Sequence, residues 1–212
     1  MSTAADTRPL GRPLGQRLRE DTRDLHTQAE KSTFQALMVK GELPKAVYVE
    51  GLGQMLLMHR ALEAKLRDAR AESPALAAIV TDQQFREAHI ERDLAHFGVD
   101  QANITPSPAT AEFVASLEGA TPMQLLGMHY VLEGSNNGNR FIARAVAGAY
   151  RLDGAGLAFL MPHGEQQPAV WEAFKAAMAE QDFTEAEMDE VVAAAKHMFH
   201  AIIAIHEGLL PA

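Results

Sequence analysis

Apolar residues recur every three to four positions along most of the chain, which is the spacing of amphipathic helices. Leu14, Leu18 and Leu25 begin such a series near the N-terminus. Gly41 is typical of a helix end, and Pro44 is typical of a first helical turn. The first half is therefore predicted to form helices over residues 14–29, 33–39, 44–71 and 73–97, the last with a break near 81–82.

The second half carries clear helix start signals. Thr121 followed by Pro122 is an N-cap followed by a proline, and Thr184 with Glu187 forms a capping box. The predicted helices here cover 108–117, 121–150, a segment beginning at 166–168, and 184–209. Because no stretch alternates as a strand would, the predicted fold class is all-α. We expect a flexible arm over 1–13 and one helical domain over 14–212.

Composition narrows the function classes. The 212 residues are 47% hydrophobic and 22% charged, as in an ordinary globular domain. The absence of cysteine excludes disulfides, zinc-thiolate sites, thiolate-bound heme and cysteine nucleophiles. A net charge of −9 argues against nonspecific nucleic-acid binding. With neither a membrane-spanning run nor a signal-peptide core, we expect a soluble cytoplasmic protein without membrane or nucleic-acid partners.

The predicted helix over 121–150 contains an unusual run of poor helix formers, Gly-Ser-Asn-Asn-Gly at 134–138. Glycine inside a helix costs about 1 kcal/mol relative to alanine. Two glycines four residues apart share one face, where a flat or bulky group can approach the bare backbone. Two simpler interpretations stay open, namely tight helix–helix packing at small residues and two helices joined by a loop.

The nine histidines do not form a familiar metal motif, because neither His-Glu-x-x-His nor Glu-x-x-His occurs. His26 lies on the first amphipathic helix, and Glu30 follows it by one helical turn. A carboxylate at this spacing can accept a hydrogen bond from one ring nitrogen and leave the other free to bind iron. The simpler interpretation is an exposed histidine beside an acid.

Two segments carry a more specific signal. Residues 18–30, Leu-Arg-Glu-Asp-Thr-Arg-Asp-Leu-His-Thr-Gln-Ala-Glu, resemble the proximal helix of heme oxygenases. Residues 129–138, His-Tyr-Val-Leu-Glu-Gly-Ser-Asn-Asn-Gly, resemble the distal helix of the bacterial, biliverdin-producing branch of that family. Residues 156–159 and 171–178 also match in order and spacing. The resemblance implies a single-domain heme-oxygenase-like bundle with heme between the proximal helix and a kinked, glycine-containing distal helix.

The resemblance also implies roles for individual residues around heme b. His26 would be the axial iron ligand, and Glu30 its hydrogen-bonding partner. Gly134 and Gly138 would flank the iron on the opposite side, so that bound dioxygen has room. The remaining heme-binding residues would be two cations near the propionates together with one phenol, namely Arg19, Lys175 and Tyr130.

The distal segment departs from mammalian-type members of the family. They have an aspartate after the first distal glycine, which organises the catalytic water, whereas this chain has Ser135. The tyrosine that supports this aspartate aligns here with His59. We expect this water to be held by a polar set drawn from Ser135, Asn136, Asn137 and His59, with His129 as the alternative to His59.

The implied activity is oxidative opening of heme to biliverdin, with release of iron and carbon monoxide. It would use O2 and an external electron donor, a ferredoxin or flavin reductase. A second possible function is that of a heme carrier or sensor that does not degrade heme. This alternative stays open, because it needs the same His26 and Gly134. A thiaminase-type or di-iron enzyme of the wider fold lacks support, since the sequence has neither a cysteine nucleophile nor the Glu-x-x-His metal-binding pair of di-iron proteins.

Overall fold

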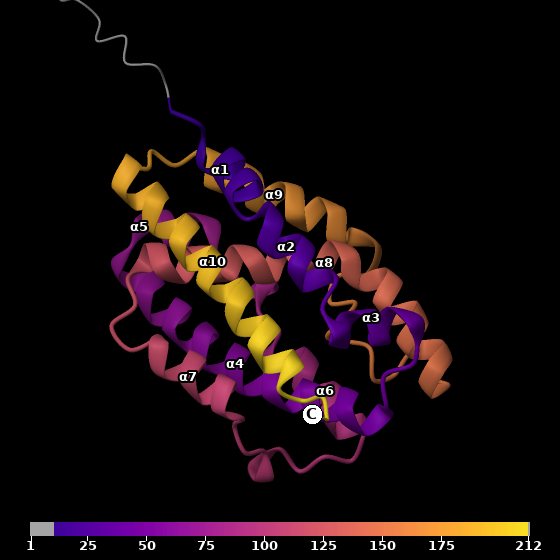
Figure 1. Cartoon of the computed structure of the whole chain (residues 1–212). Helices are drawn as coiled ribbons and strands as arrows, with labels where there is room; N and C mark the ends of the chain where they lie inside the picture. The colour runs from indigo at the N-terminus through magenta and orange to yellow at the C-terminus, as the bar shows by residue number, and fades with distance from the viewer. Residues whose placement is uncertain (1–10, 212) are drawn as a thin grey trace, which may run out of the picture.

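Ten α-helices account for most of residues 11–211, the part of the chain that the computed structural model describes (Figure 1). They are α1 Leu14–Asp21, α2 Arg23–Glu30, α3 Thr33–Lys40, α4 Lys45–Glu72, α5 Pro74–Ile79, α6 Glu87–His96, α7 Pro108–Ser116, α8 Pro122–Tyr150, α9 Gln167–Ala179 and α10 Glu185–Glu207. Short 3-10 turns cover 82–84, 101–103 and 164–166. No strand forms within the described residues, so the predicted all-α class is confirmed.

Local sequence signals set most of the helix ends. Thr184 forms the predicted capping box at the start of α10, and Thr121, predicted as an N-cap, forms a complete capping box with Gln124 at the start of α8. Gly41 ends α3 with φ +70°, a left-handed conformation that glycine adopts without steric cost. Of the expected N-terminal arm over 1–13, residues 1–10 lie outside the described part, and residues 11–13 precede α1 without helical structure.

Two predicted helices are divided in the structure. The helix expected over 14–29 ends at Asp21 and restarts at Arg23, because Thr22 adopts φ −109° and ψ 1°. Its buried hydroxyl donates to the carbonyl oxygen of Leu18 at 2.6 Å, a side-chain bond that competes with regular helix geometry. The segment expected over 73–97 breaks more widely than predicted, since residues 80–86 separate α5 from α6.

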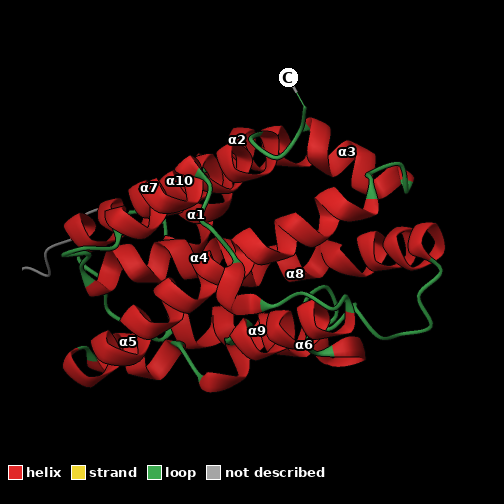
Figure 2. Cartoon of the chain, turned by 90° about the horizontal axis from the view of Figure 1, so that it is seen from below, coloured by secondary structure: helices red, strands yellow, loops and turns green. Residues whose placement is uncertain are grey.

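Helices α4 and α8 lie in the middle of the molecule (Figure 2). In that view α2, α3, α7 and α10 lie on one side of them, and α5, α6 and α9 on the other. The contact between α8 and α10 is the most extensive one between helices. Gly127 allows it, because a Cβ at this position would collide with the carbonyl oxygen of Val191 and approach Ala194 Cβ to 2.9 Å.

Helix α8 continues through the glycine-rich run and changes direction along its length (Figure 1). The interpretation of two helices joined by a loop is therefore wrong. None of the helices in the described residues is long and apolar enough to cross a membrane. The chain thus presents two long central helices, one of which carries a bare backbone strip in its middle.

Candidate functional site

Helix α2 is packed less completely than its neighbours. None of its eight residues is buried, although Leu25 and Ala29 lie partly buried against the core. His26 is exposed over 57% of its side chain, and its ring meets the edge of Phe199 from α10 at 5.9 Å between centroids. Its Nδ1 lies 3.5 Å from Glu30 Oε2, as the spacing predicted. This contact leaves Nε2 as the nitrogen available to a ligand.

Helix α8 has an open strip that consists of Gly134, Ser135 and Gly138. Ser135 and Gly138 are exposed, and Gly134 is partly so. A Cβ at Gly138 would meet no atom within 4 Å, whereas one at Gly134 would touch only the ring of Trp171, at 3.5 Å. Tight helix packing therefore does not explain Gly138. The strip leaves room for a ligand beside the helix backbone.

The polar side chains of the strip turn back onto their own helix. Ser135 Oγ donates to the carbonyl oxygen of Leu132 at 2.7 Å, and Asn137 Nδ2 donates to that of Gly134 at 3.0 Å. The serine oxygen keeps acceptor capacity, and the asparagine keeps its own carbonyl oxygen. Both groups are therefore able to accept a hydrogen bond from water.

A cavity of about 90 Å³ lies between α3, α4, α8 and α10 and brings together three of the predicted site residues, His59, Ser135 and Asn136. Phe34 and His206 stack at its wall, 4.3 Å apart, and burial lowers the pKa of His206 to about 4. The space is large enough for water but not for a porphyrin. It is called the distal cavity below.

Asn137 is separated from these three residues. It lines a second cavity of about 510 Å³, together with Arg140 and the loop over 160–168. Asn136 and Leu160 line both cavities, so the two are neighbours. His129 lines neither of them. It is buried and bonds Gln84 at 2.9 Å, and burial lowers its pKa to about 3.

His59 belongs to a buried polar network beneath the distal cavity. Its Nδ1 lies 3.1 Å from Glu63 Oε1. The same carboxylate accepts from the backbone amides of Arg86 at 2.6 Å and Glu87 at 3.1 Å, which begin α6. Burial acts to raise the pKa of Glu63, but these hydrogen bonds outweigh it and lower that pKa. Glu63 is therefore ionised at neutral pH and fixes the His59 ring.

A second part of the network contains the ion pair between Arg86 and Glu133, and each of these two residues is 1% exposed. Arg86 Nη2 donates to Glu133 Oε1 at 2.7 Å and to His163 Nε2 at 3.0 Å. Asn136 Nδ2 lies 3.4 Å from the same Glu133 oxygen. Burial is the main cause that raises the pKa of Glu133, to about 7, against the opposing charge of Arg86. No sequence pattern singles out Glu133 or Arg86.

The predicted cationic end of the site surrounds Tyr130. Its ring packs against Trp171 from α9 at 5.5 Å, and the Lys175 ammonium lies 5.6 Å from the Trp171 centroid. Burial raises the pKa of the Tyr130 hydroxyl, whereas the positive charge of Arg19 acts in the opposite direction. Three helices, α1, α8 and α9, thus bring two cations and a phenol to one end of the site.

The described residues contain no group of three or more His, Asp or Glu side chains arranged to hold a metal ion. A metal at this site would therefore depend on a single protein ligand plus donors from a ligand of its own. His26 meets that requirement, because it is exposed and one of its ring nitrogens is held by Glu30.

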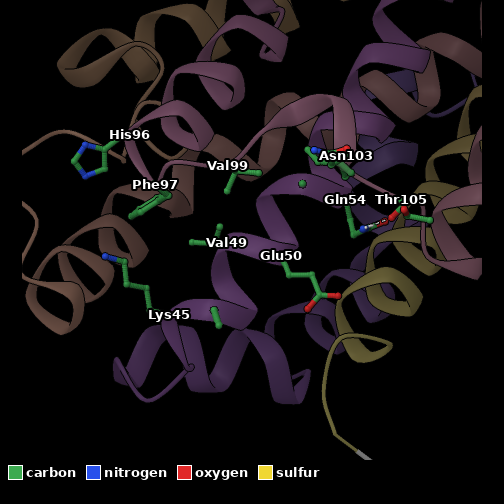
Figure 3. Close-up of a pocket in the computed structure, with 12 residues that line it drawn as sticks. Lys45, Val49, Glu50, Gln54, His96, Phe97, Val99, Asn103 and Thr105 are labelled. Carbon is green, nitrogen blue, oxygen red and sulfur yellow. Dashed lines mark hydrogen bonds between the residues drawn. The ribbon is translucent and has the colours of Figure 1, made fainter.

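A larger groove lies away from all these residues. It has a volume of about 820 Å³ and runs between α4 and the segment 96–105 (Figure 3). Lys45, Val49 and Phe97 line it, and Gln54 donates to the carbonyl oxygen of Thr105 at 3.0 Å. None of the predicted site residues reaches it. The candidate site is therefore the region that contains His26 and the open strip.

Comparisons with known sequences agree on one family. The heme oxygenase family profile matches residues 12–207. Heme oxygenase 1 of Homo sapiens is 27% identical over 206 residues, which cover 92% of this chain and 71% of the human protein. Heme oxygenase 1 of Nostoc sp. is 28% identical over 153 residues, which cover 69% of this chain and 64% of that protein.

Solved structures share the fold. A heme oxygenase from Leptospira interrogans matches with a TM-score of 0.84 at 24% identity, over 91% of this chain and 98% of that chain. Heme oxygenase-1 from Synechocystis sp. PCC6803, in complex with heme, matches with a TM-score of 0.84 at 22% identity, over 92% and 90%. A TenA homologue from Pyrococcus furiosus matches with a TM-score of 0.71 at 10% identity, over 93% of this chain and 100% of that chain. Because the fold is shared this widely, activity has to be argued from the site.

Proposed function

The chain belongs to the heme oxygenase family, and we propose that it binds heme b between α2 and α8 and cleaves it to biliverdin, iron and carbon monoxide. The observation that carries this proposal is the incomplete packing of α2. An exposed histidine with a carboxylate partner lies on a helix that has no buried residue. A flat apolar ligand would cover Leu25 and Ala29 and complete the contacts of this helix.

The described residues fit heme at three points. His26 would hold the iron through Nε2, while Glu30 fixes the orientation of its ring. Gly138, open on its Cβ side, would let the macrocycle approach α8. Arg19 and Lys175 would pair with the propionates. Tyr130, which is partly buried, packs against Trp171 and feels the charge of Arg19, would contribute its hydroxyl at the same end.

The oxygen side of the site would be built from the strip and the distal cavity. Gly134 and Gly138 would leave room beside the iron, and Ser135 and Asn136 would accept hydrogen bonds from water. His59, oriented by Glu63, would hold a second water position. Heme supplies the iron that activates dioxygen and is itself oxidised, so the protein contributes orientation, protons and exclusion of competing reactions.

The electrons for this reaction would come from outside the chain. The sequence has no cysteine, so it supplies neither a redox-active dithiol nor cysteine ligands for an iron–sulfur cluster. We propose a ferredoxin or flavin reductase as the donor, and the cytoplasm as the location in which such donors and free heme are both accessible.

A visible-spectrum titration with hemin, followed by reductant in air, tests the proposal. The expected result is a Soret band that saturates at one heme per chain and then decays, while a broad red absorbance of the bilin grows. A saturated band that persists under reductant would instead identify a heme carrier or sensor. A titration without saturation would overturn the proposal.

The assignment of the ligand is tested in the same spectrum. The change His26→Ala should abolish the spectrum of histidine-ligated heme. The change His200→Ala is the matched control, because His200 is another exposed histidine on a helix, α10, and should leave the spectrum unchanged. An unaltered spectrum in the His26 variant would remove this residue as the ligand.

A further inference from the structure

A buried carboxyl group lies directly behind the open strip and has no role in the function proposed above. Glu133 precedes Gly134 in α8, and it is 1% exposed. Its Oε1 faces both Arg86 Nη2 and Asn136 Nδ2, at 2.7 Å and 3.4 Å. Its Oε2 is buried and has no hydrogen-bond partner within residues 11–211. The two oxygens of this side chain therefore have different surroundings.

We propose that Glu133 stores a proton behind the open strip and releases it to the distal cavity through water at Asn136. Glu133 acts through this water and is therefore a positioning residue. This proposal rests on the heme-degrading function proposed above. Asn136 connects the two places, because its side chain contacts Glu133 and it also lines the distal cavity. Since Oε1 accepts from Arg86 and Asn136, the stored proton is assigned to Oε2.

The proton step balances within these groups and water. The Oε2–H bond breaks, the proton passes to water, and the electron pair stays on the carboxylate. Arg86, 2.7 Å away, then forms a full ion pair with that carboxylate. Solvent water returns the proton later, so no other reactant is required. The guanidinium cannot take the proton itself, because it is already fully protonated and only donates.

The surroundings hold the neutral and ionised forms close in free energy. Burial and the negative charge of Glu63 raise the pKa of Glu133, whereas the charge of Arg86 lowers it. The resulting pKa of Glu133 lies near neutral pH, where an acid can both hold a proton and donate it efficiently. The other titratable and charged groups around the Arg86–Glu133 pair, on α4, α6, α8 and the loop after α8, are His59, Glu63, Arg70, His89, His129 and His163.

Two neighbouring histidines, His163 and His129, do not compete for this proton. His163 Nε2 accepts from Arg86, so this nitrogen is unprotonated, and the pKa of His163 is lowered to about 4 by burial and by the charge of Arg86. His129 is also neutral, since burial lowers its pKa to about 3. Glu63 remains ionised through its hydrogen bonds. Compared with Glu63, His129 and His163, Glu133 is therefore the group that changes charge near neutral pH.

The first test uses the protein without heme and infrared spectroscopy. The wild-type protein should show the carbonyl band of a protonated carboxylic acid at pH 5.5, with a midpoint of disappearance near 7. The change Glu133→Gln should remove this band. The change Glu63→Gln is the control and should keep the band at pH 5.5, because Glu63 itself is already ionised; its midpoint should move to lower pH, because the charge of Glu63 raises the pKa of Glu133. Identical bands in the wild type and the Glu133 variant would overturn the proposal.

Stability of the same variants separates proton storage from a purely structural ion pair. A protonated Glu133 is isosteric with glutamine, so Glu133→Gln should unfold at the same urea concentration as the wild type at pH 5.5. If the carboxylate were instead permanently ionised and paired with Arg86, replacing it with glutamine would lower the free energy of unfolding at every pH. Loss of stability in Glu133→Gln at pH 5.5 would therefore overturn the proposal.

The second test measures heme turnover as a function of pH. The wild-type rate should fall as pH rises through 7, and Glu133→Gln should be about tenfold slower at pH 6 with a flat profile. The hemin dissociation constant should not change. Matching pH profiles would overturn the proposed role. If the wild type binds but does not degrade heme, the proposed function fails, whereas the infrared band still decides whether Glu133 stores a proton.

Discussion

Gly138 offers the sharpest test of whether the open strip exists for a ligand. In a helix interior, alanine is favoured over glycine by about 0.8–1.0 kcal/mol. A Cβ at Gly138 would meet no atom within 4 Å, so Gly138→Ala should gain this free energy without a clash. In a chain of this size, the gain corresponds to a rise of about 2–4 °C in the melting temperature of the heme-free protein.

Gly148 provides a matched control in the same helix. A Cβ at this position would likewise meet no atom within 4 Å, but Gly148 lies near the end of α8, away from the distal cavity. Gly148→Ala should therefore stabilise the heme-free protein by a comparable or slightly smaller amount. Its hemin affinity and turnover should match those of the wild type.

The two variants should separate once heme is present. A methyl group at position 138 would press on a ligand that lies against the backbone, and overpacking of this kind costs about 1–3 kcal/mol. The hemin dissociation constant of Gly138→Ala should therefore rise at least about fivefold, in a spectroscopic titration run beside differential scanning calorimetry. If both variants bind and degrade heme equally well, the glycine does not serve the ligand and the placement of heme on this strip is wrong.

Three further predictions concern other parts of the molecule. Gly127→Ala should lower the free energy of unfolding by about 2 kcal/mol or more, because its Cβ would collide with the backbone of α10 at Val191; an unchanged denaturation midpoint would contradict this packing. His206→Phe keeps the stack on Phe34 but removes a buried group whose pKa is lowered from 6.5 to about 4. As pH falls from 6.5 to 4, the wild type should therefore lose about 3 kcal/mol more stability than the variant; parallel curves of stability against pH would refute this. Asn137→Leu should leave turnover intact, because Asn137 lines the second cavity rather than the distal one; a severalfold loss would return it to the set that holds water.

The helices were predictable because their signals are local. Capping boxes, Gly41 and the prolines act within one helical turn, and the structure keeps them in place. The break at Thr22 was not predictable in this way. Threonine is tolerated inside helices, and only its buried bond to the carbonyl oxygen of Leu18 shows that the helix is interrupted there.

The site was predictable only in part. His26 with Glu30 and the glycine pair follow a spacing of four residues, which the sequence displays directly. The Arg86–Glu133 pair joins residues 47 positions apart, and both occur in contexts that look ordinary along the chain. A glutamate between a leucine and a glycine gives no sign that it is 1% exposed. Such burial depends on how the residue that precedes α6 is packed between α4 and α8, which no local pattern contains.

The incomplete packing of α2 has a consequence for the lifetime of the protein. A helix of eight residues is marginal by itself, and here none of those residues is buried. Amide hydrogens of α2 should therefore exchange with solvent faster than those of α8, and proteases should cut first at this helix. Heme at a hundredfold excess over its dissociation constant would add about 2.7 kcal/mol against unfolding. Heme supply would then set how long each chain survives degradation.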